Sequence, residues 1–160
     1  MVQTKPLEQL VAFARAIGVD VHEGPIQRST RVPGLDIVAG CVHVDVGELR
    51  GLGDFLHEVA HVALTPAKER HALDEWIVGT PTQEISALAW TWAVGQHLGL
   101  EADHVFHDEI ISGNGPTLRE NFLAGCYVGV PMLQYWGLTN IADASGAVTK
   151  YPQMLKWTRD

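Results

Sequence analysis

Apolar residues change their spacing along the first part of the chain. Over residues 6–17 they recur at mixed three- and four-residue intervals, which predicts an amphipathic helix ending at Gly18. Over residues 19–46, Val, Ile and Thr alternate with polar residues between Gly-Pro and Pro-Gly pairs. The clearest strand is 41–46, where every second residue is valine, so the valines share one face. This region predicts a small antiparallel sheet of two or three strands.

Beyond residue 53 the pattern is helical almost to the end of the chain. We expect helices over residues 54–64, 67–78, 80–98, 102–111, 117–130 and 131–137, and a short last helix around 152–158. Asp54 is the expected N-cap of the first. The longest has the clearest ends, because Thr80-Pro81-Thr82-Gln83 is a capping box with proline in the first turn, and Gly99 follows the last turn. Its apolar residues lie on several faces, which predicts a central buried helix.

Together these elements predict an α+β protein, in which a small N-terminal antiparallel sheet packs on a mostly helical body. The 160 residues suit one domain spanning 1–160. Hydrophobic residues make up 46% and charged residues 19%, which excludes a disordered chain and a coiled coil. The net charge of −8 argues against nucleic acid and anionic membranes as partners, since little positive charge is present to meet phosphates.

Cysteine usage and the N-terminal residues predict a cytoplasmic protein. Two cysteines, Cys41 and Cys126, are too few for a disulfide scaffold, and free thiols are the favoured state. The first residues carry Lys5, Glu8 and Arg15, so they lack the uncharged core of a signal peptide.

Residues 121–142 contain no charged side chain, and that length could span a bilayer. The stretch is interrupted by VGVP and by GLTN, which breaks its hydrophobicity twice. We therefore expect a buried helical hairpin or an oligomer contact here rather than a membrane span. A homo-oligomer is compatible with this expectation.

The segment most informative about chemistry is His57-Glu58-Val59-Ala60-His61. On a helix, positions i and i+4 lie on one face, so both imidazoles can reach one metal ion. Glu58 lies beside the first ligand, where its carboxylate can take a proton from water and deliver it to a leaving amine. The spacing is that of zinc-dependent peptidases.

Chance does not account well for this motif. From the composition, such a pentapeptide is expected in about 0.02 of chains of this length. Apolar neighbours on both sides also place it on a buried helix, where histidine and glutamate are costly to bury without a partner. We therefore predict a metal site.

A catalytic zinc site needs a third protein ligand. Leu64 and Ala67 stand where a longer HExxHxxGxxH motif would have Gly and His, so the ligand must lie elsewhere. Glu84 is the best candidate, because Ala87 one turn later permits close helix packing, although an acid in a first helical turn also simply complements the helix dipole. The competing candidates are His71, Glu75, His104, His107 and Asp108.

These residues resemble the ImmA/IrrE family of bacterial and phage zinc metallopeptidases over roughly residues 5–100. The matching features are an N-terminal helix, the strand CVHVDV, the HEVAH helix, and a later helix that begins with Glu84-Ile-Ser-Ala87. The resemblance implies a gluzincin-like site, with His57, His61 and Glu84 on zinc and Glu58 as the base. Some members of the family cleave transcriptional repressors.

The chain departs from that family in two places. The family's Ala-rich run ending in Met-Pro is replaced by Trp90-Thr91-Trp92-Ala93-Val94, and residues beyond 100 have no counterpart.

Peptide hydrolysis also needs a hydrogen-bond donor that stabilises the charge on the carbonyl oxygen. The candidates for this donor are Tyr127, Tyr135, Tyr151, His104 and His107. Asp74 is a candidate partner for a zinc-bound histidine.

The sequence thus predicts a zinc-dependent peptidase that hydrolyses peptide bonds in a peptide or protein substrate. An alternative is a non-catalytic zinc-containing binding or regulatory module that uses the uncharged 121–142 surface. A third reading treats HEVAH as accidental in a helical interaction protein.

Overall fold

The computed structural model describes residues 4–75, 79–141, 146 and 149–160. Among these residues, the sheet has the strand order β1-β3-β2, where β1 is Val21–Glu23, β2 is Leu35–Val38 and β3 is Cys41–Val44. Strands β2 and β3 form an antiparallel hairpin, and Val42 and Val44 point into the core as predicted. The two turn residues, Ala39 and Gly40, have φ of 50° and 77°. Gly40 is required there, because a Cβ would lie 2.4 Å from Arg70 O.

The sheet is mixed, so the prediction of an antiparallel sheet is wrong for one pair. β1 runs parallel to β3, with Val21 opposite Val42. The segment between β1 and β2 makes no hairpin, and its Ile26 N–H donates to the Asp45 carboxylate instead. Alternation of apolar residues marks strands but says nothing about the direction of their neighbours.

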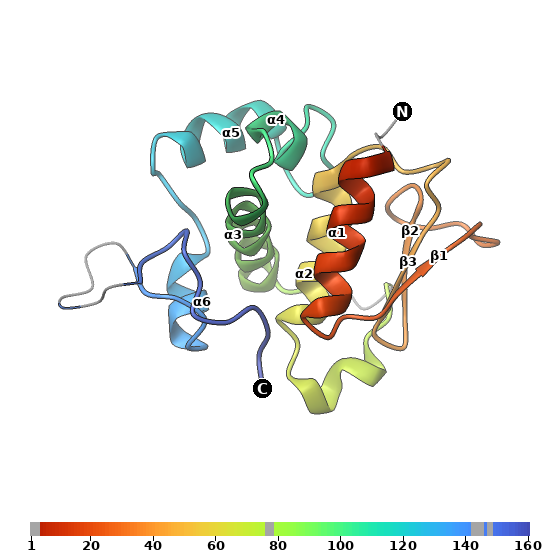
Figure 1. Cartoon of the computed structure of the whole chain (residues 1–160), viewed down its shortest axis with the longest axis horizontal. Coiled ribbons are helices and arrows are strands. Elements are labelled where there is room, and N and C mark those ends of the chain that lie inside the picture. The colour runs from red at the N-terminus through yellow and green to blue at the C-terminus, as the bar shows by residue number, and fades with distance from the viewer. Residues whose placement is uncertain (1–3, 76–78, 142–145, 147–148) are drawn as a thin grey trace.

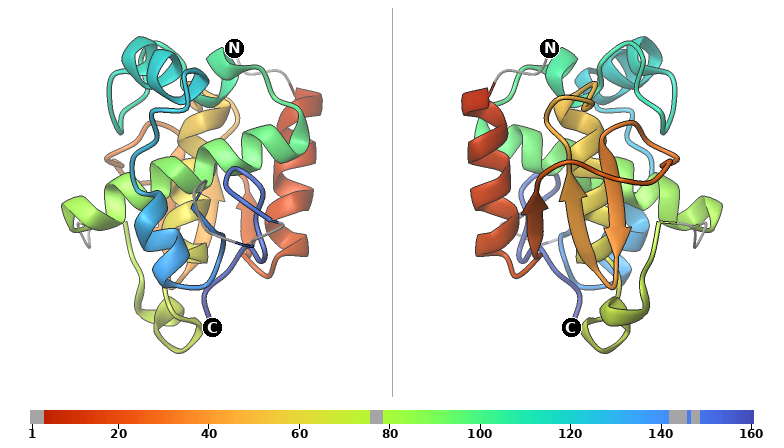
Figure 2. Two further views of the ribbon diagram at one scale, coloured as in Figure 1. Left: turned by 90° about the vertical axis from the view of Figure 1, so that its left-hand side faces the viewer. Right: turned by 90° about the vertical axis from the view of Figure 1, so that its right-hand side faces the viewer.

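Helix α2 (Leu52–Ala63) lies between the sheet and helix α3 (Pro81–Leu98), with α1 (Thr4–Ala16) alongside it (Figures 1 and 2). Every residue of α2 except His61 is buried, whereas α3 is buried only from Ser86 to Gly95. The most enclosed helix is therefore the one that carries HEVAH, not the longer α3. The α+β class is confirmed, with a small sheet on a mostly helical body.

The ends of α3 are as predicted, while those of two other segments are not. Thr80 and Gln83 form the capping box, and Gly99 ends α3 with a left-handed φ of 69°. Gly51, rather than Asp54, is the N-cap of α2. The expected helix 67–78 is only a 3-10 helix, η1 (Ala67–Ala72), and residues 76–78 of that prediction lie outside the described residues.

The remaining helices are shorter than predicted. They are α4 (Ala102–Val105), α5 (Gly115–Leu123) and α6 (Val130–Tyr135). The residues around 152–158 form turns instead of a helix, with Trp157 packed edge-on against Phe13 and Trp90. Backbone hydrogen bonds tie this segment to distant residues: Arg159 N–H donates to Ala63 O at the end of α2, and Leu155 N–H donates to Leu138 O.

The uncharged stretch from 121 does not form a helical hairpin over its described residues, 121–141. α6 packs against α3 and buries Val130 and Leu133, whereas Leu123 and Tyr135 are largely exposed. None of the helices in the described ranges combines the length and the apolar character that a membrane crossing needs.

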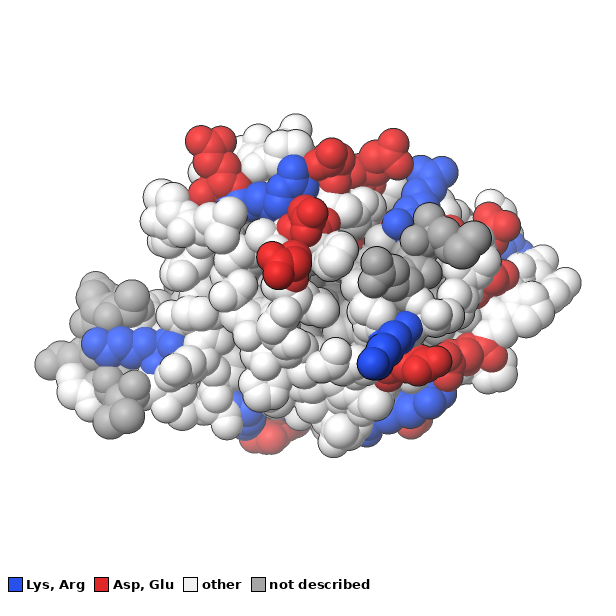
Figure 3. Space-filling view, turned by 45° about the horizontal axis from the view of Figure 1, so that its top comes forward, with Lys and Arg blue, Asp and Glu red and all other residues white. Residues whose placement is uncertain are grey.

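Charges are interspersed on the surface that Figure 3 presents. Several Lys and Arg side chains there lie beside Asp or Glu. Among the ion pairs of the described residues, Arg119 lies 2.6 Å from Asp108. Both cysteines, Cys41 and Cys126, are free thiols.

Candidate metal centre

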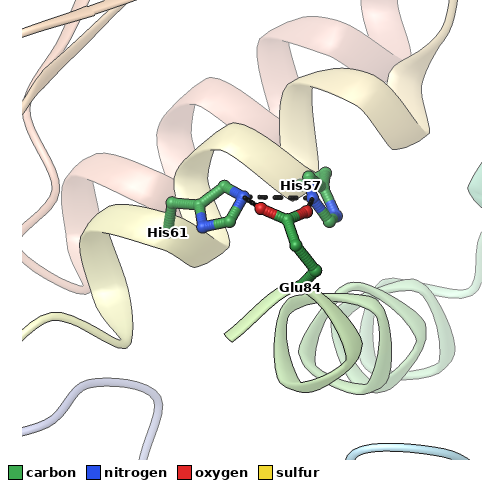
Figure 4. Close-up of side chains that lie close together, drawn as sticks. All are labelled: His57, His61 and Glu84. Atoms are coloured by element: carbon green, nitrogen blue, oxygen red, sulfur yellow. Dashed lines mark hydrogen bonds and ion pairs between the residues drawn. The ribbon is translucent and has the colours of Figure 1, made fainter. Parts of the chain in front are cut away.

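Helices α2 and α3 bring three ligand-type side chains to one point (Figure 4). His57 and His61 are one turn apart on α2, and their Nε2 atoms are 3.1 Å apart. Glu84, in the first turn of α3, places Oε2 3.0 Å from His57 Nε2 and Oε1 3.3 Å from His61 Nε2. Within the described residues, this is the group whose ligand atoms all lie within 4.8 Å of one another.

These separations fit a tetrahedral metal ion. Two atoms bound to one zinc at tetrahedral angles are about 3.4 Å apart, because Zn–N and Zn–O bonds are about 2.0–2.2 Å long. The two histidine nitrogens are 3.1 Å apart, and each Glu84 oxygen lies at a similar distance from one of them, Oε2 3.0 Å from His57 Nε2 and Oε1 3.3 Å from His61 Nε2. Two imidazole nitrogens that face each other beside one carboxylate are also a donor set that zinc accepts readily.

The local packing directs Glu84 toward the histidines. Ala87, one turn along α3, is fully buried, and α3 packs against α2. Gly79 lies just before α3, and a Cβ there would be 2.8 Å from Glu84 Oε1 and 3.5 Å from His61 Cε1. The glycine therefore leaves the space that the carboxylate occupies.

The electrostatics of the cluster favour an ionised Glu84. Hydrogen bonds with His57 and then with His61 hold the pKa of the Glu84 carboxyl far below its usual range. A carboxylate that stays charged near neutral pH is ready to bind a cation.

Glu58 lies beside the cluster but outside the ligand set. It is buried, and its side chain lines a cavity of about 80 Å³ together with His61 and Glu84. Arg31 lines the same cavity, with Nη2 3.6 Å from Glu58 Oε1. The HEVAH motif predicts the place of Glu58. No sequence signal points to Arg31, because it lies in an irregular segment 26 residues before the motif's first histidine.

A second, smaller cavity of about 10 Å³ lies beside His57, with Asp54 and Ser112 in its walls. His57 Nδ1 and Ser112 Oγ are buried and have no hydrogen-bond partner among the described residues. The cavity is about the size of one water molecule, and water commonly fills such polar spaces. Asp74, the predicted partner of a zinc histidine, instead accepts from Arg28 at 3.2 Å.

The other candidate ligands lie outside the cluster. His107 Nε2 is 2.7 Å from the buried carboxylate of Asp54, which also accepts from Ile111 N–H at 3.2 Å. Glu75 accepts from the backbone N–H groups of Arg31 and Val32. His71, His104 and Asp108 are exposed and contribute to neither cavity.

The predicted donors for a carbonyl oxygen are also elsewhere. Tyr151 is buried and donates to Ala89 O at 2.7 Å, and Tyr127 packs edge-on against it. Tyr135 is 81% exposed. None of these tyrosines lines either cavity beside the cluster.

Comparison with known proteins gives no relative from which a function could be inferred. No family model, curated protein or solved structure has significant similarity to this chain. The resemblance to ImmA/IrrE peptidases therefore rests on the sequence motifs, and the three-residue cluster is what the structure adds to them.

Proposed function

We propose that this protein is a zinc-dependent peptidase of the cytoplasm, acting on a peptide or protein substrate. The observation that carries the proposal is the convergence of His57, His61 and Glu84, with the Glu58 carboxylate in the wall of the adjoining cavity. The free thiols of Cys41 and Cys126 support a reducing compartment.

The roles of the residues follow from their chemistry. His57, His61 and Glu84 would hold the ion, and zinc when bound acts as a Lewis acid and makes water a better nucleophile near neutral pH. Glu58 takes a proton from the attacking water and passes it to the leaving nitrogen. Its burial suits this task, because a water-poor site strengthens each charge interaction.

The cavity also supports a peptide substrate. Ile37, Leu64, Leu73 and Trp136 form part of its wall, beside the polar groups of Glu58 and Glu84. Such a mixture suits a chain that carries both an apolar side chain and a polar peptide bond.

One observation favours the alternative of a non-catalytic zinc-containing module. The uncharged stretch exposes Leu123, Val128 and Tyr135, by 67%, 41% and 81%. Single exposed apolar residues are common on monomers, so this observation is weaker than the cluster.

Glu58→Gln separates the two functions. We expect the variant to bind zinc like the parent, because Glu58 is outside the ligand set, yet to lose at least about 10²-fold of peptide hydrolysis, because Gln cannot take a proton. The measurement is mass spectrometry of a mixed peptide library incubated with zinc-loaded protein, with a chelated sample as blank. Exposed Glu48→Gln is the matched control.

Cleavage that needs zinc and disappears in Glu58→Gln, but not in Glu48→Gln, supports the peptidase. Equal cleavage by parent and Glu58→Gln contradicts the role of Glu58. A zinc-loaded parent that cleaves nothing in the library favours the non-catalytic module.

A further inference from the structure

Peptide hydrolysis needs a donor for the carbonyl oxygen, on which negative charge develops. The tyrosines and histidines that the sequence offered for this task are engaged or exposed elsewhere. The cavity walls beside the metal centre therefore have to supply another group, if the proposed function holds.

Arg31 is the one Lys or Arg among the described residues that lines both of the cavities beside the cluster. Its side chain is 38% exposed, so it is partly removed from water. Within the described part of the chain its guanidinium makes no hydrogen bond, only the 3.6 Å ion pair with Glu58. Because a guanidinium has five N–H donors, most of them remain available to a ligand.

The backbone of Arg31 is held in place by a buried carboxylate. Glu75 Oε1 accepts from the N–H groups of both Arg31 and Val32, and Val32 itself is buried. Glu75 N–H in turn donates to Ile37 O in strand β2. An anchored backbone beneath an otherwise unbonded guanidinium lowers the entropy cost of binding a ligand there.

Other arginines nearby are already occupied. Arg28 makes two 2.7 Å hydrogen bonds to the Asp36 carboxylate. Arg70 donates to the backbone carbonyls of Thr65 and Arg159. Of these three arginines, Arg31 is the one that lines the cavity, and most of its donors remain available.

We propose that Arg31 is a catalytic residue, whose guanidinium binds the carbonyl oxygen of the scissile peptide bond as that oxygen becomes an oxyanion. The inference rests on the proposed peptidase function and names the electrophilic group of the same site. Arginine suits this role because it stays protonated throughout and its N–H groups form strong bonds to anionic oxygen.

The step balances without any further reactant. The water oxygen bonds to the carbonyl carbon while Glu58 takes a water proton, and the C=O π pair moves to the oxygen facing Arg31. The pair then returns, the C–N bond breaks, and Glu58 gives its proton to the departing nitrogen. Arg31 keeps all its protons, and the products are a carboxylic acid and an amine, which exchange one proton to become a carboxylate and an ammonium ion.

The test measures anion binding rather than turnover. The full chain is loaded with zinc and titrated calorimetrically with methylphosphonate, a tetrahedral anion, and with imidazole, a neutral ligand for an open metal position. The variants are Arg31→Met and Arg31→Lys. Arg15→Met is the matched control, because Arg15 is a half-exposed arginine paired with Glu23 away from the site.

We expect Arg31→Met to bind methylphosphonate about 10- to 100-fold more weakly than the parent, as loss of a charge-assisted hydrogen bond implies. Arg31→Lys should recover part of that loss. Zinc and imidazole binding should be unchanged, and Arg15→Met should behave like the parent.

Equal methylphosphonate binding by the parent and Arg31→Met overturns the role of Arg31, while retained imidazole binding leaves the peptidase proposal standing. Loss of zinc in Arg31→Met also overturns it, because Arg31 would then support the ligands rather than the oxyanion. If the zinc-loaded parent binds neither probe, the metal has no open position, and the peptidase proposal falls together with this one.

Discussion

Gly79, which lies just before α3, leaves the space that the Glu84 carboxylate occupies in the metal centre. A Cβ added at Gly79 would lie 2.8 Å from Glu84 Oε1. The atom it would meet is the end of a flexible side chain, so the carboxylate would move rather than the helix. Glu84 would then point away from the place that it shares with His57 and His61.

Gly79→Ala should therefore lower zinc affinity by about 10- to 100-fold, the range found when the supports of metal ligands are removed. Competition with a zinc-binding dye measures the affinity. Gly47→Ala is the control, since Gly47 is exposed and its Cβ would meet only Asp45, at 3.4 Å. Equal affinities for the two variants would show that Glu84 does not depend on this space.

The spacing of apolar residues within a helix predicts where that helix lies. Hydrogen bonds between segments far apart in the sequence leave no such pattern. The HEVAH helix is expected at 54–64 and lies at 52–63, because helical periodicity is local. The expected helix 67–78 fails, because its backbone is needed elsewhere: Leu73 O accepts from Gly40 N–H, and Glu75 N–H donates to Ile37 O. No pattern within residues 67–78 encodes those partners.

Some residues of the candidate site can also be predicted from local sequence patterns, whereas Arg31 cannot. His57, Glu58 and His61 share one motif, and Glu84 follows from a helix start that can be predicted. Arg31 belongs to an irregular segment whose position is set by hydrogen bonds to Glu75, 44 residues later. Only the folded chain brings it to Glu58.

A metal ion shared by α2 and α3 should stabilise their packing. Zinc that binds the folded state alone adds about 2.7 kcal/mol at a hundredfold excess over its Kd. For a chain of this size that corresponds to a rise in melting temperature of roughly 5–10 °C. Thermal melts with zinc and with chelator measure it, and His61→Ala should remove the difference. Identical melting curves for the parent in both conditions would mean that no ion connects the two helices.

In the whole molecule, the C-terminal third supports the helices of the metal centre. Gly53 on α2 and Gly95 on α3 both lie against Val105, where a Cβ would approach to 1.8 and 2.4 Å. The buried Asp54 carboxylate, one turn before His57, is bonded to His107 at 2.7 Å. The residues beyond 100 therefore help to form the surroundings of the metal-binding helix.

His107→Ala should destabilise the protein by about 1–3 kcal/mol, because it leaves the buried Asp54 carboxylate short of a partner. Urea unfolding measures the loss, and exposed His104→Ala should change little. With Asp54→Asn as the background, the cost of His107→Ala should shrink. An unchanged cost in that background would contradict a coupling between the two side chains.

Zinc titration of Glu84→Ala shows whether His57, His61 and Glu84 together bind one zinc ion. We predict one ion per parent chain and an affinity at least about 10²-fold lower in Glu84→Ala, because a ligand should matter at least as much as its supports. His104→Ala, which removes an exposed histidine outside the cluster, should bind like the parent. A Glu84→Ala variant that binds zinc as tightly as the parent would contradict the three-residue site.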